Sequence, residues 1–121
     1  MPAFVRAQAS FRELKAQERL VRTALVLEAY KHETGHIPER LEALSTGDLH
    51  GVSVATSEHG YRFSFHTKDG TYAYTATPEK ESAARRSFCV DGAGESVATP
   101  DGAEPRLENG RCLAAAEQRT P

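Results

Sequence analysis

The sequence predicts an α+β fold, in which one long N-terminal helix packs on an antiparallel β-sheet of three to four strands. Two observations lead to this fold class. Residues 3–33 contain no Gly or Pro and are rich in strong helix formers such as Ala, Leu, Glu, Arg and Lys. Residues 61–77 alternate between apolar and polar or small residues on both sides of Asp69-Gly70, which is the pattern of a β-hairpin.

Length and composition limit the domain count and the classes of partner. A chain of 121 residues is long enough for one modest core. Lys and Arg total 15 against 17 Asp and Glu, and the net charge of −2 comes from interspersed charges of both signs. We therefore expect no nucleic-acid partner. The chain has no run of about 18 apolar residues, so we expect it to be soluble.

The predicted helix spans residues 2–34. Pro2 suits the first helical position, and Gly35 suits the position just after the last one. Apolar residues crowd between Leu20 and Tyr30, where they cover more than half of the helix circumference. We therefore expect this second half of the helix to be buried in the core of the domain.

The first half of the helix carries a narrow apolar stripe on an otherwise polar surface, formed by Phe4, Phe11 and Leu14. We expect this half to project from the domain. Exposed apolar side chains on a projecting helix usually mark a protein contact. The alternative is that these side chains fold back onto their own domain.

Three segments follow the helix: a loop at residues 35–59, an antiparallel sheet at residues 60–98, and a C-terminal loop and tail at residues 99–121. Within the first loop, residues 39–44 favour a short amphipathic turn or helix. After the hairpin, the sheet continues with a strand at residues 87–90 and a possible fourth strand at residues 96–98.

The chain has two cysteines, Cys89 and Cys112. Two thiols are too few for a structural zinc site unless histidines join them, so the pair favours one disulfide in an oxidising compartment. Such a bridge would close a loop of about twenty residues and tether the C-terminal segment, with a contribution of about 3 kcal/mol from chain entropy. Cys89 lies in an apolar strand segment, which favours this structural role over catalysis.

No set of residues matches a catalytic, metal or cofactor site. His32 and His36 have the spacing of a helical metal site, but Gly35 ends the predicted helix between them. Ser87 lacks the glycine-flanked turn of a hydrolase nucleophile. We therefore expect no enzyme activity, no bound metal or cofactor and no small-molecule substrate.

Short motifs follow one another along residues 2–98. The helix begins with Pro2-Ala3-Phe4-Val5 and ends in Ala29-Tyr30-Lys31-His32-Glu33-Thr34-Gly35-His36-Ile37-Pro38. The sheet region contains Gly60-Tyr61-Arg62-Phe63, Tyr74-Thr75-Ala76-Thr77-Pro78 and Arg86-Ser87-Phe88-Cys89-Val90-Asp91, with Gly94 after them. In this order the motifs resemble those of type IV pilins and of the pseudopilins of type II secretion.

The resemblance implies that residues 1–121 form a single pilin-like domain. It implies a structural subunit of a type IV pilus or a secretion pseudopilus that packs against other pilin or pseudopilin subunits through Phe4, Phe11 and Leu14. In those families a processing site and a membrane helix precede the proline, and here Met1 would replace that segment. The implied location is a periplasmic domain anchored in the inner membrane, or an extracellular filament.

One departure from the family pattern concerns calcium. The long acidic calcium loop of major pseudopilins is not evident, which favours a pilin-like or minor subunit. Asp91 and Asp101 could hold Ca²⁺ together with backbone carbonyls, but the dense series of Asp and Asn residues that calcium loops usually contain is missing.

A second class of function remains open, namely a periplasmic or secreted protein-binding module. Its binding face would be the polar side of the sheet, with Arg62, Ser64, His66, Ala73 and Thr75. The reading frame upstream of Pro2 separates the two hypotheses. An apolar stretch of about twenty residues there supports the pilin, whereas a plain start or a cleavable signal excludes it.

Overall fold

The computed structural model describes residues 3–41, 56–79, 86–99 and 103–113, and it describes the side chains of the helix from Phe11 onward. Within these ranges, a long N-terminal helix is followed by seven strands. Of the turn expected at residues 39–44, the structure describes residues 39–41, and Asp101 lies outside the described residues.

Helix α1 (Ala3–Thr34) confirms the predicted long helix. It ends where Gly35 adopts a φ of +85° and donates its N–H to the carbonyl of Lys31 at 2.8 Å. Glycine is favoured in this left-handed conformation because it has no Cβ. Lys31 and His32 lie in the last turn, where positive charge complements the helix dipole.

Five strands form one antiparallel sheet in chain order: β1 (Ser57–Glu58), β2 (Tyr61–Lys68), β3 (Thr71–Pro78), β4 (Ser87–Asp91) and β5 (Ser96–Thr99). The expectation of three to four strands is therefore too low. β1 has only two residues, which is too short to show an alternating pattern. The predicted hairpin is confirmed, with Asp69 and Gly70 at φ values of 50° and 80° in its turn.

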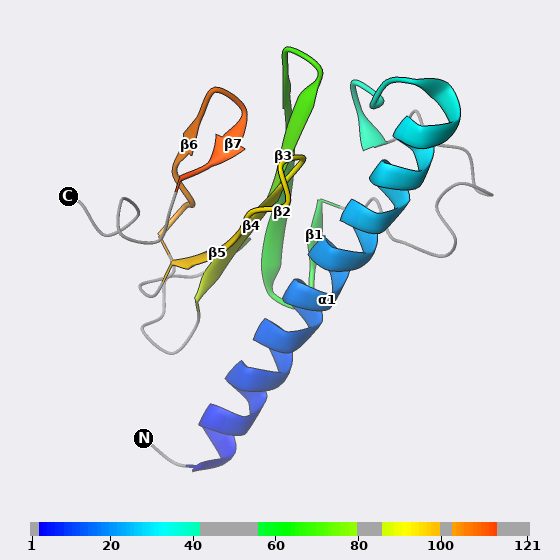
Figure 1. Ribbon diagram of the computed structural model, residues 1–121. Helices are drawn as coiled ribbons and strands as arrows, with labels where there is room; N and C mark the ends of the chain where they lie inside the picture. Colours follow the sequence, from blue (N-terminus) through cyan, green and yellow to red (C-terminus); the bar gives the residue numbers. More distant parts are fainter. Residues whose placement is uncertain (1–2, 42–55, 80–85, 100–102, 114–121) are drawn as a thin grey trace.

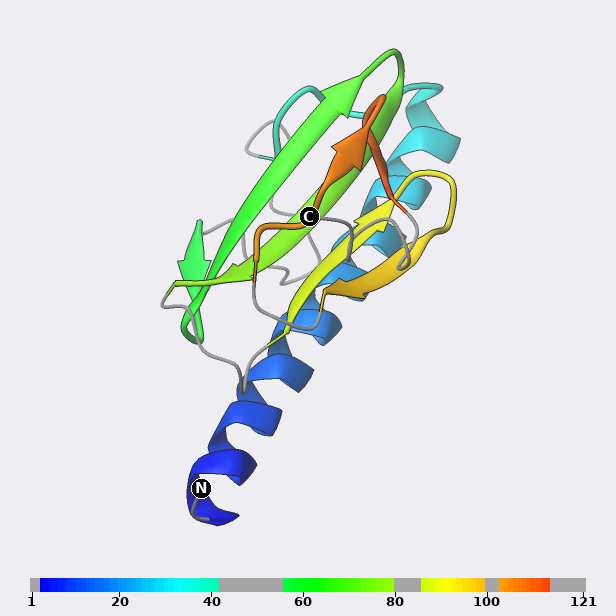
Figure 2. The ribbon, with the colours of Figure 1, turned by 90° about the vertical axis from the view of Figure 1, so that its left-hand side faces the viewer.

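One face of the sheet packs against α1 and forms the main core (Figures 1 and 2). Alternate residues of the strands point to this face, so aromatic side chains of neighbouring strands come together. Phe63 of β2 lies 6.0 Å from Tyr74 of β3, measured between ring centres. Tyr61 of β2 lies 6.2 Å from Phe88 of β4.

The C-terminal segment forms a second hairpin, β6 (Leu107–Glu108) and β7 (Arg111–Cys112). The prediction of a loop and tail is wrong for these residues. Asn109 and Gly110 take φ values of 54° and 73°, and an Asn-Gly pair is a strong signal for a tight hairpin turn. Figure 1 shows the hairpin and α1 on opposite sides of the five-stranded sheet.

Candidate protein-interaction surface

Helix α1 carries apolar side chains on two opposite sides. The side facing the sheet buries Ala16, Leu20 and Leu27, which are 0–1% exposed. Four large apolar side chains lie on the other side and form what we call the outer stripe: Phe11 (55% exposed), Leu14 (60%), Val21 (51%) and Leu25 (66%). Their spacings of three, seven and four residues follow a 3.5-residue period. The outer stripe thus has the geometry of a helix-packing seam.

The outer stripe corrects the expectation that the helix is buried from Leu20 to Tyr30. Val21, Leu25 and Ala29 are exposed, because a sheet covers only one side of a helix. The 3.5-residue spacing from Phe4 through Phe11 to Leu25 is the signal that separates these residues from the core.

The predicted packing residues Phe11 and Leu14 are both exposed, so they do not fold back onto the described part of the domain. The side chain of Phe4 lies outside the described residues. The N-terminal part of α1 extends past the end of the sheet (Figures 1 and 2). The prediction that this half of the helix projects is confirmed.

Glu13 marks the region where α1 leaves the sheet. Its side chain is largely buried, and its Oε2 accepts a hydrogen bond from Nε of Arg86 at 2.8 Å. The Arg86 guanidinium also lies 5.4 Å from the ring centre of Phe88. This ion pair attaches α1 to the domain at the point where its projecting N-terminal part ends.

Arg19 fixes the helix on the sheet with a buried charge, a feature that sequence reasoning missed. Its Nε and Nη2 donate hydrogen bonds to the hydroxyl of Tyr74 at 3.2 and 2.9 Å, and Nη1 lies 3.4 Å from Oε1 of Glu58. Its guanidinium carbon lies 3.8 Å from the ring centre of Phe63. A planar guanidinium can satisfy a carboxylate, a hydroxyl and a ring together, which explains why it tolerates burial.

A groove of about 440 Å³ lies between α1 and the turn that joins β4 to β5. From the helix it is lined by Val21, Ala24, Leu25 and Glu28. From the sheet it is lined by Tyr72, Val90 and residues 91–96. A smaller hollow of about 180 Å³ shares Val21, Val90 and Ser96 and continues along β5. Val21 and Leu25 therefore belong to both the outer stripe and the wall of the groove.

The groove combines apolar walls with an acidic rim. Glu28 and Glu95 are exposed at the rim. Burial raises the pKa of the Tyr72 hydroxyl well above its usual value, and the negative charge of Glu28 and then that of Asp91 raise it further. Tyr72 therefore stays neutral at physiological pH, and Glu28 and Glu95 supply the exposed negative charge of the groove.

The β4–β5 turn approaches the sheet closely at Gly92. Its N–H donates to the carbonyl of Tyr72 at 2.9 Å. A Cβ at this position would lie 2.8 Å from Oγ1 of Thr71, so a larger residue would require either the Thr71 side chain or the turn to shift. Gly92 therefore allows the close approach of the turn that forms the groove's outer wall.

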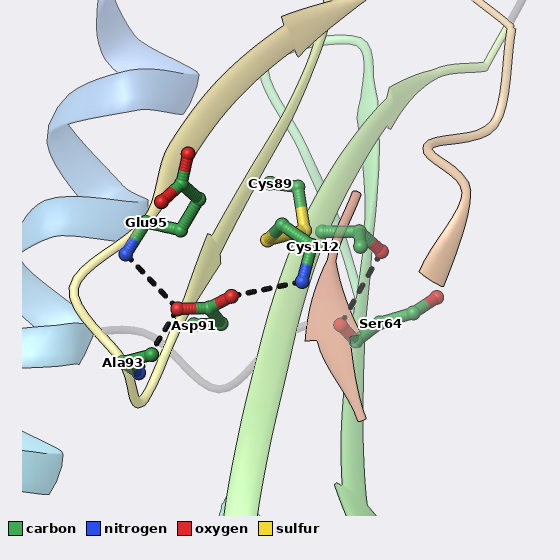
Figure 3. Close-up of a disulfide and its surroundings, with 7 residues drawn as sticks. Ser64, Cys89, Asp91, Ala93, Glu95 and Cys112 are labelled. Carbon is green, nitrogen blue, oxygen red and sulfur yellow. Dashed lines mark hydrogen bonds between the residues drawn. A yellow bond between two sulfur atoms is a disulfide. The ribbon is translucent and has the colours of Figure 1, made fainter. Parts of the chain in front are cut away.

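The opposite face of the sheet carries the predicted disulfide between Cys89 and Cys112, which is confirmed with a Cα–Cα distance of 6.0 Å. Asp91 reinforces it, as Figure 3 shows. Its Oδ2 accepts the N–H of Cys112 at 2.9 Å, and its Oδ1 accepts those of Ala93 and Glu95 at 2.9 and 3.0 Å. One buried carboxylate thus joins the β4–β5 turn to the C-terminal hairpin.

The residues weighed as chemical sites in the sequence lie in structural or exposed positions. His32 and His36 are exposed on either side of the helix end at Thr34. The hydroxyl of Ser87 donates to the carbonyl of Ala103. Over the described ranges, no group of three or more His, Cys, Asp and Glu side chains could hold a metal ion.

The polar sheet face proposed for a binding module is partly covered. Ala73 is 0% exposed and Thr75 is 2% exposed. Both strands β3 and β4 contact β7 on this face. A partner approaching this face would reach Arg62 and His66, which are exposed, and Ser64, which is half-buried.

No family model, curated protein or solved structure matches the chain. In the part of the chain that the structure describes, α1 is not apolar enough to cross a membrane. Information on function therefore comes from the surface of the molecule, above all from the outer stripe and the groove beside it.

Proposed function

We propose that the chain is a structural subunit of a type IV pilus or a type II secretion pseudopilus, which assembles through its N-terminal helix and catalyses no reaction. The outer stripe is the observation that carries this proposal. Four large apolar side chains along one side of a helix are poorly suited to water, and a neighbouring helix would cover them. Part of the stripe lies on the projecting half of α1, where other subunits can reach it.

The remaining architecture supports a structural role. Arg19 and Glu13 attach α1 firmly to the sheet, so a subunit held by its helix would also have its sheet held in a defined orientation. The disulfide fastens the far side of the sheet, which would form the outer surface of the filament. Disulfides are typical of the periplasm and of secreted proteins, where such filaments assemble.

The proposal assigns the membrane anchor to a helix encoded ahead of Pro2. Such a helix needs about twenty apolar residues. It would hold the subunit in the inner membrane before assembly, with the sheet domain in the periplasm. Sequencing the upstream reading frame tests this part directly, and a plain start codon or a cleavable signal there would contradict it.

The assembly role is tested with Leu14→Glu in the cells that carry the gene. A charge in the outer stripe should abolish surface filaments, seen by electron microscopy, or export of the secreted proteins that a pseudopilus serves. The melting temperature of the purified domain should change little, because Leu14 is 60% exposed.

Arg62→Glu is the matched control, since Arg62 is exposed on the sheet. The filament proposal expects this variant to assemble and export normally. The binding-module alternative expects the reverse pattern, in which Arg62→Glu loses function and Leu14→Glu retains it. That reverse pattern would exclude the filament proposal.

A further inference from the structure

The groove beside α1 has a definite ligand preference. Val21 and Leu25 provide an apolar wall, and Glu28 and Glu95 place two exposed carboxylates on its rim. The best-matched occupant presents apolar side chains together with a cation, because opposite charges across a contact favour association and fix its direction.

The projecting part of the same helix carries this chemistry. Phe11 and Leu14 are exposed, and the ammonium of Lys15 lies 5.6 Å from the ring centre of Phe11. The carboxylate of Glu13 is turned toward Arg86 and is largely buried. The surface of this segment is therefore apolar and basic, complementary to the groove.

We propose that the groove of one copy binds residues 11–15 of a second copy, with the two α1 helices parallel. This inference rests on the proposed function and specifies one contact within the filament. The charges favour the parallel direction. Lys15 lies on the C-terminal side of Leu14, and Glu28 lies on the C-terminal side of Leu25. Parallel helices that pair Leu14 with Leu25 therefore bring the ammonium of Lys15 toward the carboxylate of Glu28. Antiparallel helices would carry this ammonium toward Gln17, on the N-terminal side of Leu25.

One like-charged group lies close to this contact. Glu18 is the next residue of the 3.5-residue pattern after Leu14, and it would approach the acidic rim of the groove. Its Oε1 is 3.2 Å from Nη2 of Arg22, one turn further along the same helix. This ion pair offsets the repulsion.

The contact joins two different surfaces, so it does not close on itself. Each copy that donates residues 11–15 still has an empty groove, and each copy that accepts them still has a free projecting segment. Repetition of such a head-to-tail contact produces an open filament. Pairing of Leu14 with Leu25 would shift successive copies by about 16 Å along the helix axis, at about 1.5 Å per residue.

Engineered cysteines test the pairing, since the two native cysteines are bonded to each other. Purified Leu14→Cys protein is mixed with purified Leu25→Cys protein of different mass and oxidised gently. We expect the mixed dimer in several-fold excess over both homodimers. Homodimers in excess would indicate stripe-to-stripe pairing in register and would overturn the inference. A statistical mixture, or no dimer, would also overturn it.

Two charge variants test the direction of the contact. Lys15→Glu, placed in the Leu14→Cys protein, should lower the yield of the mixed dimer several-fold. Arg62→Glu makes the same change of charge, but Arg62 is exposed on the face of the sheet away from α1, outside both the groove and residues 11–15. It should leave the yield unchanged, and equal losses in both variants would contradict a directed contact.

The contact and the proposed function can fail separately. If the mixed dimer forms but Leu14→Glu leaves filaments and export intact in cells, the filament function is wrong and the contact stands. If Leu14→Glu abolishes filaments but the mixed dimer does not form, the function stands and this contact is wrong.

Discussion

Arg19 of α1 donates two hydrogen bonds to the hydroxyl oxygen of Tyr74 in β3, at 2.9 and 3.2 Å. The two residues are 55 positions apart in the sequence, and both are buried. A charged group in a core must be matched by polar partners, and hydrogen bonds are more directional than apolar contacts. Together with the buried side chains of Leu20 and Leu27, this pair holds one side of α1 on the sheet and leaves the side with the outer stripe exposed.

Tyr74→Phe removes the hydroxyl that Arg19 uses as an acceptor and keeps the ring. We expect a loss of about 1–3 kcal/mol in the free energy of unfolding, because the buried guanidinium keeps its desolvation cost and loses two hydrogen bonds. Urea denaturation followed by circular dichroism measures the change. Tyr30→Phe is the control at a less buried ring and should cost less than about 0.5 kcal/mol. Similar losses in the two variants would show that the Arg19 contact adds little.

The two sides of α1 make opposite predictions for the same substitution. Leu27→Ala should cost about 2–5 kcal/mol, because Leu27 is fully buried against the sheet. Leu25→Ala should cost less than about 1 kcal/mol in the isolated domain, because Leu25 is 66% exposed. Denaturant unfolding at low protein concentration keeps association out of the measurement. A large loss for Leu25→Ala would mean that this side of the helix packs within one chain.

Much of the fold follows from local patterns in the sequence. The helix over Ala3–Thr34 was predictable because it is rich in helix formers and has no Gly or Pro before Gly35, and the hairpin of β2 and β3 because apolar residues alternate on both sides of Asp69-Gly70. β1 escaped prediction because pairing with β2 produces it, and two residues carry no pattern. The C-terminal hairpin was missed although Asn109-Gly110 signals it, because its flanking strands are only two residues long.

The candidate surface was less predictable, because it depends on which side of a uniformly apolar stretch the sheet covers. Phe11 and Leu14 were identifiable because polar residues surround them. Val21 and Leu25 lie among buried residues, so the 3.5-residue spacing that links them to Phe11 and Leu14 is recognisable only once the position of the sheet is known. The groove brings Glu28 and Glu95 together from distant parts of the chain, so no local pattern could indicate it.

The disulfide should account for a large part of the domain's stability. Cys89 and Cys112 are 23 residues apart, so the double variant Cys89→Ala with Cys112→Ala should lose about 3 kcal/mol through the chain entropy of the unfolded state. Thermal unfolding measures the loss. Alkylation gives an independent check, since a mass increase should require reductant as well as denaturant. Alkylation without reductant, in protein prepared under oxidising conditions, would contradict the bridge.

Tyr72 predicts a loss of stability at high pH. Burial, the carboxylate of Glu28 and then that of Asp91 raise the pKa of its hydroxyl far above the usual value, which is near 10 in the unfolded chain. The pKa of Tyr72 is higher in the folded than in the unfolded state, so its protonated hydroxyl stabilises the fold. This contribution to the free energy of unfolding is fully present below about pH 10 and is lost as the pH rises further. The decline should reach at most about 1.4 kcal/mol per pH unit from this one group. Urea denaturation at several pH values between about 9 and 11 measures it.

Tyr72→Phe should flatten the decline, because the variant has no proton to release, whereas Tyr30→Phe should keep the slope of the unsubstituted protein. An unchanged slope in Tyr72→Phe would show that the buried hydroxyl does not control stability in this range.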